Sequence, residues 1–92
     1  MMNDFSVAGL DVVVVGAARS GVAAAELLAR RGARVTVSEM RGSVADADRL
    51  RGAGIALELG GHRDETLASA DLVVLSPGVS PRLPGIVGAR RR

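Results

Sequence analysis

VVVVGAARSGVAAAELLARRG, residues 12–32, begins with a short apolar run and continues into a row of good helix formers. The run from Asp11 to Val15 ends at Gly16 and is typical of a strand buried on both faces. Residues 20–31 predict a helix, and Gly32 stands where a helix C′ glycine belongs. A buried strand, a glycine turn and a helix form the opening unit of a parallel α/β sheet.

Strand-like and helix-like segments alternate along the rest of the chain. The strand-like segments are residues 34–39, 55–59 and 71–78, and the helix-like ones are 43–54 and 64–68. In the first helix we expect Leu27 and Leu28 on the same face as Ala24, and in the second we expect Ser43 as N-cap. Gly52 or Gly54 is expected to end that second helix. Residues 1–92 therefore predict one Rossmann-like α/β domain of three layers, with a parallel sheet of about four strands in the order 3-2-1-4.

The turn after the first strand departs from the dinucleotide fingerprint G-x-G-x-x-G. Gly16 and Gly21 match its first and third glycines, whereas Ala18 replaces the second, which lets the backbone approach a pyrophosphate. The helix N-terminus that follows still offers N–H groups at residues 19–22, and Arg19 and Ser20 add a cation and a hydroxyl. We predict that this turn holds a phosphate group; the alternative is that the glycines only make the turn.

Two further features end predicted strands. Glu39 follows Gly16 by about twenty residues, the offset of an acid that accepts hydrogen bonds from ribose, and its charge disfavours a 2′-phosphate. Ser76, Pro77 and Gly78 form a sharp turn after the fourth strand, next to the Gly16 turn if the strand order is right. Both therefore predict contacts with a ligand; the alternatives are a surface carboxylate and an ordinary turn.

Composition narrows the function classes. The formal charge is +2 and the single aromatic residue is Phe5, so we expect no nucleic-acid binding and interpret Arg90–Arg92 as a solvated tail. There are no cysteines, and the lone His62 has no evident metal-binding or catalytic partners. With no signal-like start and no apolar run of about 20 residues, the sequence predicts a cytoplasmic protein without membrane association.

Together these stretches closely resemble the N-terminal domain of the Mur ligases, in particular the members that add D-glutamate. The resemblance covers roughly Asp11 to Pro84 and is most specific in G-x-x-x-S-G after the first strand and L-S-P-G-V after the fourth. It implies a Rossmann-like domain of peptidoglycan synthesis that holds the UDP part of UDP-N-acetylmuramoyl-L-alanine.

The resemblance also implies roles for individual residues. Arg19 and Ser20 match positions that contact the uridine diphosphate, and Gly78 matches a glycine beside the nucleotide. Glu39, Met40 and Arg41 match the group around uracil and ribose, although the family commonly has aspartate and a small polar residue at the first two. The complete candidate site is Gly16, Ala18, Arg19, Ser20, Gly21, Glu39, Met40, Arg41, Ser76, Pro77 and Gly78.

Full Mur ligases also need a domain with a G-x-x-G-K-[ST] loop for ATP, magnesium ligands and a carbamylated lysine. This sequence has no lysine and no such loop, so we expect it to bind neither ATP nor Mg²⁺ and not to catalyse ligation alone. It is expected to be a fragment or truncated product whose missing domains lie on a longer or separate chain. The alternatives are a small NAD(H)-binding regulatory domain, which Ala18 disfavours, and a remnant that does not fold stably.

Overall fold

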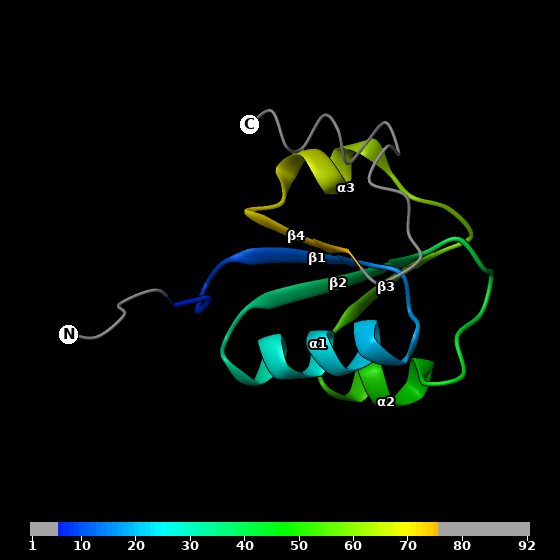
Figure 1. Cartoon of the computed structure of the whole chain (residues 1–92), viewed down its shortest axis with the longest axis horizontal. Coiled ribbons are helices and arrows are strands. Elements are labelled where there is room, and N and C mark those ends of the chain that lie inside the picture. The colour runs from blue at the N-terminus through cyan, green and yellow to red at the C-terminus, as the bar shows by residue number, and fades with distance from the viewer. Residues whose placement is uncertain (1–5, 76–92) are drawn as a thin grey trace.

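A computed structural model describes residues 6–75 and contains one four-stranded parallel sheet (Figure 1). The elements are β1 (Asp11–Val15), α1 (Arg19–Arg30), β2 (Arg34–Glu39), α2 (Ala47–Gly52), β3 (Ala56–Leu59), α3 (Asp64–Ser69) and β4 (Leu72–Leu75). The strand order is β3-β2-β1-β4, and α1 and α2 cover one face of the sheet while α3 lies on the other. The predicted three-layer, Rossmann-like architecture with the order 3-2-1-4 is confirmed.

The valines of β1 supply the centre of both hydrophobic layers. Val12 and Val14 pack on the α1 side, whereas Val13 and Val15 pack on the α3 side against Leu67. All four valines are at most 3% exposed, as a central strand covered on both faces requires. The apolar run that predicts β1 is therefore explained by two cores rather than one.

Helix α1 packs on the sheet through one face. Val22 and Ala25 are buried and Leu28 packs against the same core, but Leu27 is 44% exposed. Leu27 and Leu28 line one small cavity together, as the expected shared face implies, but a step of about 100° per residue turns Leu27 roughly 200° from Ala25 and away from the sheet. Gly32, with φ +92°, takes the predicted position just after the helix.

Helix α2 starts later than predicted. It begins at Ala47, so Ser43 is not its N-cap; Asp46 holds that place without a side-chain capping bond. The chain before it runs as a loop that packs Val44 against the core, and the late start leaves Leu50 fully buried. Of the two candidate stops, Gly54 has the positive φ of a C′ residue, +83°.

The longest helix within residues 6–75 is α1, with 12 residues. A membrane-spanning helix needs about 20 apolar residues. No helix in this part of the chain is therefore long and apolar enough to cross a bilayer.

Candidate functional site

The turn between β1 and α1 has a backbone that exposes donors at the helix start. Gly16 adopts φ +97°, which favours glycine, and its N–H donates to the carbonyl of Ser38 at 2.8 Å. Ala18 is the N-cap, with extended backbone, and its carbonyl accepts the N–H of Val22 at 2.9 Å. Val22 is thus not one of the free donors expected at residues 19–22.

The remaining donors at this helix start are available. The N–H groups of Arg19, Ser20 and Gly21 find no acceptor among residues 6–75, as the geometry of a helix N-terminus dictates. Arg19 and Ser20 are exposed, and the guanidinium of Arg19 forms no ion pair within the described part of the chain. These groups and the helix dipole together favour an anion.

Glu39 faces the turn after β1. Its Oε1 accepts the N–H of Ala17 at 2.7 Å, and its Oε2 accepts the N–H of Arg41 at 3.0 Å and the Nε–H of Arg41 at 3.1 Å. The side chain is only 10% exposed. We expected this carboxylate to point toward a ligand. The partner that sequence reasoning missed, Ala17, contributes a backbone N–H, which no residue type in the sequence signals.

The charge of Glu39 is held by these contacts. Burial alone would raise the pKa of its carboxyl group, but the hydrogen bonds from Arg41 and Ala17 and the Arg41 charge outweigh burial and lower the pKa to about 2. Glu39 is therefore ionised at neutral pH although it is nearly buried.

The main chain of Glu39 is held from the β3–α3 loop. Its carbonyl accepts the N–H of Gly60 at 2.9 Å and the N–H of Gly61 at 3.3 Å, and the Gly60 N–H also donates to the carbonyl of Arg41 at 2.9 Å. Loops that follow β1, β2 and β3 thus meet at Glu39, at the carboxyl ends of the strands. Ligands of open α/β sheets bind at this edge.

A cavity of about 640 Å³ lies between the start of α1 and the loop that leads into α2. Three arginines line it. Among residues 6–75, Arg49 pairs with Glu26 at 2.8 Å and Asp46 at 3.8 Å, Arg41 pairs with Glu39, and Arg19 has no ion-pair partner. The rest of the lining is Glu26 and Asp46, the two partners of Arg49, together with Ala17, Ala18, Val22, Ala23, Val44 and Ala45.

The structure gathers part of the predicted site. Ala18, Arg19 and Arg41 line this one cavity, and Glu39 lies behind it. Met40 is 62% exposed and is not part of the lining. Ser76, Pro77 and Gly78 lie outside the described residues.

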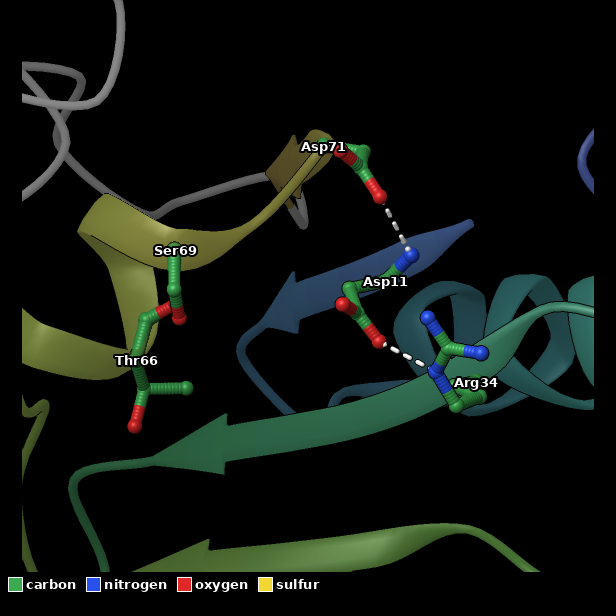
Figure 2. A network of polar contacts seen from close by, with 5 residues as sticks. All are labelled: Asp11, Arg34, Thr66, Ser69 and Asp71. Atoms are coloured by element: carbon green, nitrogen blue, oxygen red, sulfur yellow. Dashed lines mark hydrogen bonds and ion pairs between the residues drawn. The ribbon is translucent and has the colours of Figure 1, made fainter. Parts of the chain in front are cut away.

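A second cavity, of about 540 Å³, lies toward the opposite ends of the strands. In its lining, Asp11 Oδ1 pairs with Arg34 Nε at 2.6 Å, and Asp71 Oδ2, from outside the lining, accepts the N–H of Asp11 at 2.8 Å (Figure 2). These contacts join the starts of β1, β2 and β4. The arginine of this cavity, Arg34, is thus paired with Asp11, whereas Arg19 has no ion-pair partner in the described part of the chain.

His62 lies in the loop between β3 and α3, directly after Gly61. Its Nδ1 hydrogen-bonds with Oγ of Ser38, which is 1% exposed. Residues 6–75 contain no group of three His, Cys, Asp or Glu side chains placed to hold a metal ion.

Comparison with known proteins places this geometry in context. The family "Mur ligase MurD-like, N-terminal domain" matches residues 10–92. UDP-N-acetylmuramoylalanine--D-glutamate ligase of Anaeromyxobacter dehalogenans is 52% identical over 86 residues, 91% of this chain and 19% of the ligase. The ligase of the same name from Geobacter metallireducens is 46% identical over 88 residues, 92% and 20% respectively. The chain thus spans about a fifth of the length of these curated relatives.

Solved structures share the fold. A pseudomurein peptide ligase type C from Methanothermus fervidus superposes with a TM-score of 0.79 at 27% identity, over 90% of this chain and 17% of that one. The A chain of dipicolinate synthase from Bacillus subtilis has a TM-score of 0.74 at 23% identity, over 95% and 28%. The second likeness is one of fold alone.

Proposed function

This chain belongs to the MurD-like N-terminal domain family of the Mur ligases, and from that we propose that it binds the uridine diphosphate part of UDP-N-acetylmuramoyl-L-alanine. The relatives are ligases named for this UDP-linked compound and D-glutamate, and the chain aligns with their N-terminal family domain. A domain of this size is then a substrate-holding part of the ligase, and the ligation chemistry belongs to the remaining four fifths.

One observation carries the proposal: the guanidinium of Arg19 lies on the same cavity as the start of α1, and within residues 6–75 it has no ion-pair partner and three N–H groups of that helix start have no acceptor. A diphosphate satisfies both, because its oxygens accept hydrogen bonds from helix N-terminal N–H groups and from guanidinium. The Ala18 side chain holds the phosphates further from the backbone than a glycine would.

The uridine is proposed to extend from the turn toward the end of β2. Arg41 lines the cavity there and Met40 is exposed beside it, so the two residues flank the direction in which the nucleoside leaves the phosphates. Ser76, Pro77 and Gly78 remain predicted contacts on the β4 side. ATP and Mg²⁺ are proposed to bind only the parts of the ligase beyond this domain.

The test is an amide NMR titration of the 92-residue chain with UDP-N-acetylmuramoyl-L-alanine and, separately, with NADH. We expect the UDP compound alone to shift resonances of residues 16–21 and 39–41. Shifts with NADH alone would replace the proposal with the NAD(H)-binding alternative, and a folded chain that responds to neither would refute it. A chain without dispersed resonances would be the unfolded remnant.

A further inference from the structure

The cavity is bounded by two loops that are far apart in sequence and joined by one side chain. The turn after β1 contributes Ala17 and the turn after β2 contributes Arg41, and Glu39 bonds to both through different carboxylate oxygens. Both Ala17 and Arg41 line the cavity. The distance between the two walls is therefore set by Glu39.

We propose that Glu39 is a positioning residue of this site: it fixes the turn after β1 against the turn after β2 and aims the Arg41 guanidinium at a bound nucleoside diphosphate, without touching the ligand itself. This inference rests on the proposed function for the identity of the ligand. It differs from the sequence-based prediction, in which the same carboxylate accepts hydrogen bonds from ribose.

The hydrogen-bonding capacity of the carboxylate supports the positioning role. A carboxylate has about four acceptor sites, and three bonds from protein donors already occupy the Glu39 oxygens. With the side chain 10% exposed, a ribose hydroxyl has little access to what remains.

The Arg41 guanidinium has further hydrogen-bond donors besides its Nε–H. Its Nε is bound to Glu39, whereas no bond from its two terminal nitrogens is found in residues 6–75, and its side chain is 66% exposed beside the cavity. A guanidinium is a planar fork, so fixing Nε limits the directions in which the terminal N–H groups can point. Glu39 thus restricts the orientation of the group that faces the ligand.

The main chain at Glu39 is equally constrained. Gly60 and Gly61 donate to its carbonyl, and Gly60 also binds the carbonyl of Arg41, so the strand end cannot easily follow a moving side chain. The hydrogen bond between Glu39 and Ala17 therefore holds the turn after β1 in place.

The direction in which Glu39→Gln changes ligand affinity distinguishes a positioning role of Glu39 from a purely electrostatic one. Glu39→Gln removes a negative charge near an anionic ligand, and electrostatics alone would then make binding tighter. The glutamine amide retains one oxygen but places an NH₂ against the N–H donors of Ala17 or Arg41. The hydrogen bonds that link the two loops through this side chain are then partly lost. Positioning thus predicts weaker binding, against the electrostatic trend.

The experiment measures binding of UDP and of inorganic pyrophosphate to the 92-residue chain carrying Glu39→Gln, with Glu58→Gln as matched control. Glu58 lies on β3 opposite Ser38, and its carboxylate accepts a hydrogen bond from the Thr66 hydroxyl. It does not line the cavity. We expect Glu39→Gln to weaken both probes by a similar factor of at least about tenfold, and Glu58→Gln to weaken neither. Loss confined to UDP means direct ribose contact and overturns the inference, as does unchanged or tighter binding of both probes.

A second readout needs no ligand. In Glu39→Gln the amide protons of Ala17 and Arg41 should exchange with solvent faster, and in Glu58→Gln their rates should stay at the wild-type value; unchanged rates in Glu39→Gln overturn the inference. If the wild-type chain binds neither probe, the proposed function fails, and these exchange rates alone decide whether Glu39 fixes the loops.

Should Glu39→Gln fail to fold, Arg41→Gln replaces it, because that side chain is exposed and the Ala17 bond is kept. Weaker UDP binding by a folded Arg41→Gln chain is then expected. Unchanged binding overturns the aiming of Arg41.

Discussion

Glu39 and Ala17 lie 22 residues apart in sequence, and the carboxylate of one accepts the backbone N–H of the other at 2.7 Å. The parallel register of β1 and β2 brings them together, because Val15 lies opposite Ser38 and each chain continues by one or two residues beyond that pair. The end of β2 thereby holds the turn that begins the candidate anion site, which links sheet geometry directly to the proposed ligand contacts.

Acidification should weaken this link. The folded-state pKa of Glu39 is about 2 against an ordinary value of 4.5, so its ionised form stabilises the fold above pH 4.5 and this contribution is lost as the pH falls toward 2. The shift corresponds to about 3 kcal/mol at neutral pH. Urea unfolding of wild type and Glu39→Gln from pH 7 to pH 2 should show a difference in stability that shrinks over this window. A difference that is constant with pH would contradict the assignment.

Removal of the Arg19 side chain should weaken nucleotide binding. Arg19→Ala deletes a cation of the cavity that has no ion-pair partner within residues 6–75, and we expect UDP affinity to fall by about 1.5–3 kcal/mol, the worth of hydrogen bonds to charged groups. Arg31→Ala, which makes the same charge change at the far end of α1, is the control and should leave UDP affinity nearly unchanged. Calorimetric titration of both variants checks this, and equal losses would show only a general effect of net charge.

Substitution of Gly16 should damage both folding and binding. Its φ of +97° is strained for a β-branched residue, so Gly16→Val should destabilise the chain by at least about 1–3 kcal/mol and disturb the turn. Thermal unfolding followed by circular dichroism measures the first effect, and UDP titration the second. A stable variant with normal affinity would show that the turn does not need this backbone geometry.

Two leucines provide a test of the packing. Leu50 of α2 is fully buried, so Leu50→Ala should lower the free energy of unfolding by about 2–5 kcal/mol. Leu27 is 44% exposed, and Leu27→Ala should change it by about 0.5 kcal/mol or little more. Chemical denaturation of the two variants gives the comparison, and similar losses would mean that α1 lies on the sheet through its other face.

The sequence pattern predicted an element correctly wherever residues close together in the chain determine its burial. The bounds of β1 and β2 match the predicted ones, because a run of valines buried on both faces leaves little freedom of assignment. The N-cap of α2 was predicted wrongly at Ser43, and the face of α1 that packs on the sheet was not predicted, for the opposite reason. The orientation of α1 depends on how small residues such as Ala25 approach the sheet, and the start of α2 depends on Val44 packing against the core.

The sequence by itself determined the strand order and the turn that follows β1, because alternating strands and helices allow few parallel arrangements and glycine permits a backbone that other residues resist. Only the tertiary structure decided where the Glu39 carboxylate points. A carboxylate at a strand end binds whichever donors lie nearest, and the β1–β2 register places the Ala17 and Arg41 N–H groups there. Backbone donors have no signature in the sequence, so this contact becomes visible only once the strands are side by side.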